Sequence, residues 1–134
     1  MEQEISLCQD NGLRITPTLK EILGALKKAS VPMSLADLEK QVPRCDPATI
    51  YRTIKRLKQI GVIRQLNFSE RGARYALTTA NADMDYLICE GCGKVEALET
   101  PSPFQELKKK LMESTGFRNL SHELEFYGVC SQCD

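Results

Sequence analysis

The sequence predicts an α+β fold built from two small domains. Three observations predict it: helical apolar spacing followed by a hairpin pattern, two C-x-x-C pairs confined to the C-terminal part, and opposite charge in the two parts. Residues 1–80 hold 13 Lys and Arg against 8 Asp and Glu, whereas residues 81–134 hold 5 against 10. We therefore expect one domain over residues 1–79 and a second over residues 80–134, which a chain of 134 residues is long enough to form.

Three helices are predicted in the first domain. Each begins with a short polar side chain that can cap the helix, and the first turn then carries a proline or a carboxylate. Apolar residues at helical spacing follow each start, and a glycine ends the last helix. The three starts are Thr16-Pro17, Ser34 with Asp37, and Asp46-Pro47, and the final glycine is Gly61.

A β-hairpin is predicted directly after the third helix. The residues VIRQLNF at 62–68 and ARYAL at 73–77 are rich in strand formers, and SERG between them fits a turn. Three short helices followed by a hairpin is the element order of a winged helix-turn-helix domain. The sequence therefore predicts this kind of domain over residues 1–79.

The third helix is predicted to be the DNA recognition helix of that domain. Ile50, Ile54 and Leu57 turn inward, so the opposite face carries arginine, which can donate to both acceptors of guanine, and lysine, which can hold phosphates. A basic helix face is often only a solvated face, but here it coincides with the element order and with the charge of the domain. The expected DNA-binding residues are Thr49, Tyr51, Arg52, Lys55 and Arg56, and Arg14, Lys20, Arg71 and Arg74 could add backbone or minor-groove contacts.

The second domain is predicted to mix short strands with one helix. Residues 78–85 are small and polar and fit a linker, and YLIC and KVEAL then read as two strands around a C-x-x-C turn. Ser102-Pro103 has the form of a capping box and predicts a helix start. HELEFYGVC alternates as a half-buried strand would. The helix is expected to carry Phe104, Leu107, Leu111 and Met112 on one face.

The two C-x-x-C pairs predict a structural zinc site. Zn²⁺ takes four thiolates in a tetrahedron, and one C-x-x-C turn supplies two of them. The 37 residues between the pairs are long enough for a strand, a helix and another strand. Four sulfur ligands leave no open position, so the site is expected to be structural and not catalytic. The predicted ligands are Cys89, Cys92, Cys130 and Cys133, with one Zn²⁺ per chain.

The remaining reactive side chains leave other chemistry open. Cys8 and Cys45 are predicted to be reduced, partly buried thiols, and a redox role is their alternative. His122 is the only histidine, and with Asp83 and Asp85 it could form a second divalent-metal site. A lone histidine is more often a hydrogen-bonded structural residue. No catalytic constellation is evident, so we expect that the protein is not an enzyme.

The sequence also predicts where the protein works. No apolar run approaches the roughly 18 to 20 residues of a membrane helix, so we expect no membrane association. The N-terminal residues MEQEISLCQD are acidic and polar and do not resemble a secretory signal. We therefore expect a cytoplasmic protein, in which thiols stay reduced and can bind metal.

Together these motifs resemble the ferric uptake regulator (Fur) family of metal-responsive bacterial transcription factors. The resemblance implies a winged helix that binds a palindromic double-stranded DNA operator, and a C-terminal α/β domain that forms a two-fold homodimer by sheet pairing. It also implies base contacts by Tyr51 and Arg52, a minor-groove contact by Arg14, and structural zinc at the four cysteines. The matching segments, in order, are GLRITPTLKEIL, DPATIYRTIKRLKQIGVI, RYAL, LICEGCGKVEAL and SHELEFYGVCSQC.

The sequence departs from that family at the expected sensing site. The family's sensing ligands are histidines and glutamates, and none of the four residues found here is a good metal ligand. At a second family site Asp83, Asp85 and His122 remain, but Phe104 stands at or near a glutamate position. We therefore expect a dimeric, zinc-stabilised repressor whose metal sensing is atypical or absent. The residues at the sensing positions are Pro32, Ala76, Tyr86 and Ala97.

Two alternatives stay open at this point. The first is a working sensor of metal or redox state that uses Asp83, Asp85 and His122, or Cys8 and Cys45. The second is a protein that keeps the fold, no longer binds DNA and pairs with a paralogue. The recognition-helix arginine and tyrosine argue against the second alternative, because a protein that does not bind DNA has no need of them.

Overall fold

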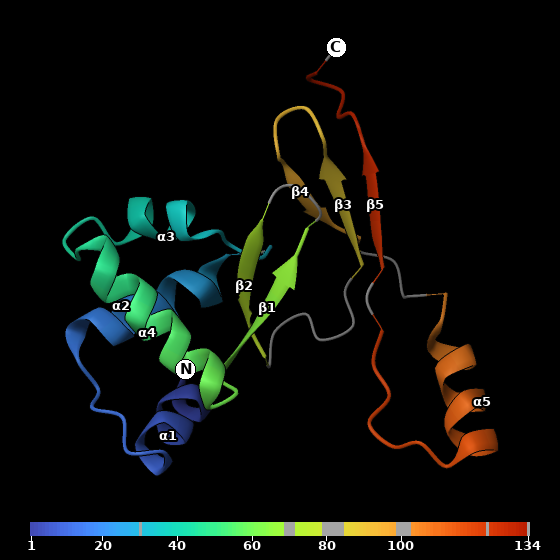
Figure 1. Cartoon of the computed structure of the whole chain (residues 1–134), viewed down its shortest axis with the longest axis horizontal. Coiled ribbons are helices and arrows are strands. Elements are labelled where there is room, and N and C mark those ends of the chain that lie inside the picture. Colours follow the sequence, from blue (N-terminus) through green and yellow to red (C-terminus); the bar gives the residue numbers. More distant parts are fainter. Residues whose placement is uncertain (30, 69–71, 79–84, 99–102, 123, 134) are drawn as a thin grey trace. The chain divides into compact units, whose positions relative to one another are not determined.

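Figure 1 shows the computed structural model of the chain, which describes residues 1–29, 31–68, 72–78, 85–98, 103–122 and 124–133. The chain divides into two compact units, Met1–Asn81 and Ala82–Asp134. Among the described residues, no helix combines the length and the apolar character that crossing a membrane requires.

The described residues of unit 1 form four helices and a two-stranded antiparallel hairpin. The hydrophobic core lies within this unit and gathers side chains from all six elements, including Leu23, Leu38, Ile54 and Leu77. Its elements are α1 (Glu2–Asp10), α2 (Pro17–Lys28), α3 (Leu35–Gln41), α4 (Pro47–Gln59), β1 (Ile63–Asn67) and β2 (Ala73–Leu77).

Local capping fixes where α2, α3 and α4 begin, as the sequence predicts. The hydroxyl of Thr16 accepts from the backbone N–H of Leu19, and the Asp46 carboxylate accepts from that of Thr49, each at 3.1 Å. Ser34 and Asp37 form the complete reciprocal capping box. These bonds satisfy backbone donors that the first helical turn leaves without a partner.

The helix α1 was not predicted from the sequence. This helix buries only Glu4 and Cys8, which lie one turn apart, so the sequence shows no broad apolar stripe there. Its other side chains are at least partly exposed. A helix that covers a core edge with so few residues gives almost no periodic signal.

In the part of unit 2 that the structure describes, the chain forms a three-stranded sheet and one helix. The strand order is β4-β3-β5; β3 pairs antiparallel with β4 and parallel with β5. The helix lies between β4 and β5 in sequence, as predicted for the segment that separates the two cysteine pairs. The elements are β3 (Tyr86–Cys89), β4 (Val95–Ala97), α5 (Gln105–Thr115) and β5 (Glu125–Gly128).

Two predictions for unit 2 are wrong. The helix α5 begins at Gln105, with Phe104 at its N-cap and no side-chain cap, and Ser102 lies outside the described residues. Phe104 has no side-chain acceptor to close a capping box, so the first turn is not held at Pro103. The predicted half-buried alternation of β5 is also absent, since Phe126, Tyr127 and Gly128 are all exposed.

Candidate nucleic-acid interface and metal centre

The amphipathic helix α4 places the predicted DNA-binding residues on its outer face. Ile50, Ile54 and Leu57 are buried in the core of unit 1. Thr49 is half-buried, and the long side chains of the opposite face reach solvent. The residues on this exposed face are Tyr51, Arg52, Lys55, Arg56 and Lys58.

The first turn of α4 carries a connected set of polar side chains. The Thr49 hydroxyl donates to Asp46 Oδ2 at 2.6 Å, in addition to the capping bond from the Thr49 backbone N–H to Asp46 Oδ1. Arg52 Nη2 donates to Thr49 Oγ1 at 3.4 Å. The hydrogen bonds from Thr49 lower the pKa of the Asp46 carboxyl, and the backbone N–H of Ala48 and then the positive charge of Arg52 add smaller contributions. This turn therefore holds a carboxylate and a guanidinium in one local network.

The last turn of α4 is joined to the hairpin. Lys58 Nζ donates to Gln65 Oε1 at 2.8 Å, and Gln65 Nε2 donates to Asn67 Oδ1 at 2.9 Å. The sequence analysis missed this link. The two-residue spacing of Gln65 and Asn67 was a usable signal, because alternate strand residues share a face.

The other basic residues of the hairpin and of the segment before α2 differ in their surroundings. Arg14 and Lys20 are exposed. Arg74 is mostly buried and pairs with Asp37 of α3 at 3.5 Å, so it ties the hairpin to that helix and is poorly placed to reach DNA. Arg71 lies outside the described residues.

The four predicted zinc ligands form one cluster. Their sulfur atoms all lie within 4.8 Å of one another, and all four thiols are free of disulfide bonds. The Sγ–Sγ distances are 3.8 Å for Cys89–Cys133, 3.8 Å for Cys92–Cys130 and 3.6 Å for Cys130–Cys133. A zinc ion with Zn–S bonds of about 2.3 Å separates its tetrahedral ligands by about 3.8 Å, so this cluster fits structural zinc.

Backbone amides prepare the cluster for a cation. The N–H groups of Cys130 and Cys92 donate to the Cys89 sulfur at 3.2 and 3.4 Å and lower the pKa of that thiol to about 6. Hydrogen bonding to Cys130, then to Cys89 and Cys92, raises the pKa of the Cys133 thiol to about 12. Negative charge on all four sulfurs at this range is unfavourable because the thiolates repel one another. A central Zn²⁺ would relieve this repulsion.

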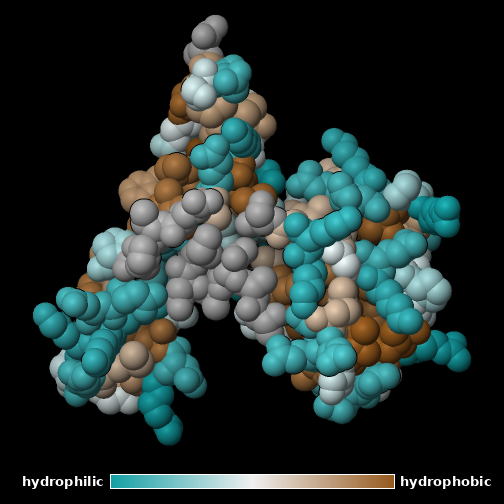
Figure 2. Space-filling model, turned by 180° about the vertical axis from the view of Figure 1, so that it is seen from behind, coloured by the Kyte–Doolittle hydropathy of each residue, from teal (hydrophilic) through white to brown (hydrophobic). Residues whose placement is uncertain are grey.

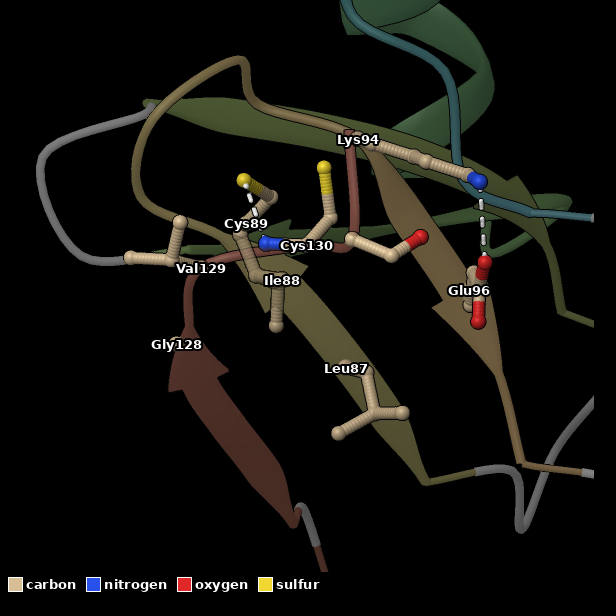
Figure 3. A pocket seen from close by; sticks show the side chains of 9 residues that line it. Leu87, Ile88, Cys89, Lys94, Glu96, Gly128, Val129 and Cys130 are labelled. Carbon is tan, nitrogen blue, oxygen red and sulfur yellow. Dashed lines mark hydrogen bonds and ion pairs between the residues drawn. The ribbon is translucent and has the colours of Figure 1, made fainter. Parts of the chain in front are cut away.

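A pocket of about 220 Å³ adjoins the cluster (Figure 3). It runs along β3 and β4 and is lined on one side by the segment that follows β5. Lys94 and Glu96 form an ion pair of 3.0 Å at its edge, and Leu87 and Val129 contribute apolar walls. The metal cluster therefore stands next to a partly apolar surface of the sheet.

Asp85 and His122 meet at the start of the sheet. Asp85 is 3% exposed, and its Oδ1 lies 3.1 Å from His122 Nε2. The ring of Phe104 packs edge-on against the imidazole, with centroids 5.7 Å apart. Asp83, the third residue of the predicted second metal site, lies outside the described residues. Among the described residues, only the four cysteines form a group with metal-ligand geometry.

The residues at the expected sensing positions are apolar or buried. Pro32 and Tyr86 are fully buried, Ala76 is buried and Ala97 is half-buried. Tyr86 carries the one oxygen among these side chains. No set of ligands for a metal is present at these four positions.

The two remaining thiols differ sharply. Cys8 is fully buried in the core of unit 1, and burial, followed by the charge of Glu4, raises the pKa of its thiol. Cys45 is half-buried, and its sulfur lies 3.3 Å from Thr18 Oγ1. Since the thiolate is the reactive form, the raised pKa and the burial both disfavour reaction at Cys8.

Unit 2 exposes large apolar side chains on both the sheet and the helix, which the sequence analysis did not predict. Brown and tan surface gathers over the lobe of the β4-β3-β5 sheet in the upper part of Figure 2. Phe126 pairs with Leu87 across β5 and β3, so these two share a face of the sheet. The exposed residues are Leu87, Phe126, Tyr127 and Val129 around the sheet, and Phe104, Leu107, Leu111 and Phe117 around α5.

Comparison with known proteins shows which family has this sequence pattern. The model of the ferric uptake regulator family matches residues 10–127. The peroxide operon regulator of Bacillus subtilis is 28% identical over 137 aligned residues, covering 99% of this chain and 92% of that protein. A peroxide-responsive repressor of Staphylococcus aureus is 29% identical, covering 99% and 90%.

Solved structures show the same fold. The ferric uptake regulator of Helicobacter pylori superposes with a TM-score of 0.75 at 20% identity, covering 98% of this chain and 89% of that one. The ferric uptake regulator of Vibrio cholerae superposes with a TM-score of 0.76 at 22% identity, covering 93% and 98%. The predicted α+β fold is therefore confirmed.

Proposed function

The chain belongs to the ferric uptake regulator family, and on that premise we propose a cytoplasmic, dimeric, zinc-stabilised repressor that binds duplex DNA and does not sense metal through the family's usual ligands. Members of this family regulate transcription, and the proposal includes no enzymatic activity. The observation that carries DNA binding is the exposed basic face of α4, next to the hairpin of the same unit.

The chemistry of α4 suits the major groove. Arg52 lies in the second turn, where a recognition helix contacts base edges, and arginine can donate two hydrogen bonds to guanine. Tyr51 is 52% exposed beside it, an unusual position for a large aromatic residue unless it contacts a partner. Lys55 and Arg56 lie further along the exposed face, where they would hold phosphates.

The exposed apolar surface of unit 2 supports a dimer. β5 is an edge strand among the described strands, with Phe126 48% exposed on it and Val129 62% exposed just beyond it. An apolar edge strand is a ready template for pairing with another strand. A second copy of the chain would supply that strand, because a two-fold axis places the same edge on both partners.

The absence of sensing ligands supports atypical regulation. Pro32, Ala76, Tyr86 and Ala97 fill the positions of the family's sensor with side chains that are buried or half-buried and poor as ligands. In our proposal, packing and the Asp85–His122 hydrogen bond do the structural work of a second metal, and Phe104 closes the space beside the imidazole.

DNA binding with and without added metal tests the proposal. The purified chain, with its zinc, is titrated against a duplex carrying the promoter of its own gene and against a shuffled duplex, over a range of salt. We expect one zinc per chain, preference for the promoter, and less than about a tenfold change in affinity on adding Fe²⁺, Mn²⁺ or Zn²⁺. Arg52→Ala should weaken binding by about 1 to 3 kcal/mol and relax specificity.

Each other outcome points to a different function. Activation of about tenfold or more by added metal, or two metals per chain, would indicate a working metal sensor. A folded dimer that shows no preference for DNA would indicate a partner for a paralogue.

A redox-responsive regulator is the second candidate, because the Bacillus subtilis and Staphylococcus aureus relatives are peroxide regulators. Treatment with peroxide before the DNA titration tests it. Loss of binding together with an oxidised Cys45 or Cys8 in a peptide map would favour this candidate over the first.

A further inference from the structure

The cap of α4 does more than close the helix. A helix N-cap needs one side-chain oxygen to accept one backbone N–H, and Asp46 Oδ1 does this with Thr49. Its second oxygen, Oδ2, accepts the Thr49 hydroxyl at 2.6 Å. Because the hydroxyl proton is committed to the carboxylate, Thr49 Oγ1 can only accept from a further group.

That further group is the guanidinium of Arg52. Its Nη2 donates to Thr49 Oγ1 at 3.4 Å, one helical turn along the same face. The positive charge of Arg52 also contributes to lowering the pKa of Asp46, after the hydrogen bonds from Thr49. The three side chains form a series of hydrogen bonds that runs from Asp46 through Thr49 to Arg52.

Two other cations of the exposed face are not held by a hydrogen bond, although Lys58 bonds to Gln65. Within the described part of the chain, neither Lys55 nor Arg56 has a side-chain hydrogen bond or ion pair. Both are exposed on the same helix, so exposure does not explain the difference. The exposed face of α4 therefore carries two cations with a side-chain hydrogen bond, Arg52 and Lys58, and two without one among the described residues.

We propose that Asp46 and Thr49 are positioning residues that orient Arg52 for a guanine edge and so set the base preference of α4. The inference rests on the proposed DNA-binding function. An arginine that is already ordered loses less side-chain entropy on binding, and this gain is kept only at the base pair that matches its orientation. The gain corresponds to about two- to tenfold in affinity.

Substitutions at Thr49 test this series of hydrogen bonds without removing the helix cap. The wild-type chain with its zinc first selects its preferred duplex from a random pool, and Arg52→Ala then identifies the base pair that Arg52 reads. Thr49→Val keeps the shape and the capping backbone N–H but has no hydroxyl, whereas Thr49→Ser keeps the hydroxyl. We expect Thr49→Val to lose about two- to tenfold discrimination at that base pair, and Thr49→Ser to retain it.

Two more variants separate positioning from simple charge or stability. Asp46→Ser keeps a capping hydroxyl but lacks Oδ2, so it should lose the same discrimination as Thr49→Val. Lys55→Ala should instead lower the slope of log affinity against log salt by about 0.9 and leave the base preference intact. Thermal melts of all variants report the stability of α4 separately.

The outcomes are distinct. Wild-type discrimination in Thr49→Val, or equal loss in Thr49→Val and Thr49→Ser, would overturn the inference while DNA binding by the wild type still stands. If the wild-type chain selects no duplex at all, the proposed function fails and this inference fails with it.

Discussion

At the scale of single residues, burial separates side chains that look alike in the sequence. Cys8 and Cys45 are both unpaired thiols outside the metal cluster, but the first is in the core and the second is half-buried beside Thr18. Asp85 is buried against His122, whereas Asp46 is exposed at a helix cap. Residue type therefore indicates which side chains could react or bind metal, and packing determines which of them are accessible.

Cys8 should resist modification in the folded protein. Burial raises the pKa of its thiol, and the nearby Glu4 adds to this, so at pH 8 the reactive thiolate is scarce and shielded. We expect iodoacetamide to label Cys45 in the native state and Cys8 only after unfolding, as measured by peptide mass spectrometry. Native labelling of Cys8 at the rate of Cys45 would contradict this expectation and revive a redox role for the buried thiol.

At the scale of elements, the C-x-x-C turn after β3 has little free space. A Cβ added at Gly91 would lie 3.1 Å from the Cys133 sulfur and 3.3 Å from the Cys133 Cβ, closer than ordinary contacts. In a tetrahedral zinc site the sulfur is fixed by its bond to the metal, so it cannot move away without cost. A side chain at position 91 would therefore require Cys133 to shift by a few tenths of an ångström.

Gly91→Ala should loosen the zinc. We expect release to a chromogenic chelator to be faster by about tenfold, the lower end of what disturbing the surroundings of metal ligands costs. Gly128→Ala is the matched control, since a Cβ there meets no atom within 4 Å and the residue belongs to the same unit. Equal release rates for wild type and Gly91→Ala would show that Cys133 can move aside for the added methyl group without weakening zinc binding.

At the scale of the whole molecule, the two units are stabilised differently. The hydrophobic core cluster lies in unit 1, whereas the described residues of unit 2 include few buried apolar side chains: Tyr86, Ile88, Cys89 and Val95. Unit 2 is therefore expected to depend on zinc and on a second copy for its stability.

Zinc removal should unfold one unit and spare the other. Because the energy of structural zinc binding is folding energy, a strong chelator should collapse the dispersed amide signals of residues 82–134 in an NMR spectrum. The signals of residues 1–81 should keep their positions, since their core contains no metal ligand. Simultaneous loss of both sets of signals would mean that the units fold cooperatively.

Charge placed on the exposed edge should separate the proposed dimer. Phe126→Glu would bury two like carboxylates close to the two-fold axis, which is unfavourable without partners. We expect a monomer by light scattering at micromolar concentrations. Leu7→Glu, which changes an exposed apolar residue of unit 1, is the control and should stay dimeric. A dimeric Phe126→Glu would move the interface away from β5.

The sequence alone determined the features that depend on neighbours along the chain. The starts of α2, α3 and α4 rest on hydrogen bonds between residues three apart, so their capping residues were enough to predict them. The fold class followed from the order of these elements, and the metal cluster was predicted from two C-x-x-C spacings, which bring ligands together in pairs.

Only the tertiary structure decided which distant residues meet and which faces stay open. Asp85 reaches His122, and Asp37 reaches Arg74, across 37 residues of chain, a separation that no local pattern encodes. The same holds for β5, whose parallel pairing with β3 leaves Phe126 exposed at the edge of the sheet. Apolar periodicity shows that one face of a helix or strand is stabilised by burial against another surface. Whether that partner lies in the same chain is settled by packing, because burial depends on how all the elements share a limited core.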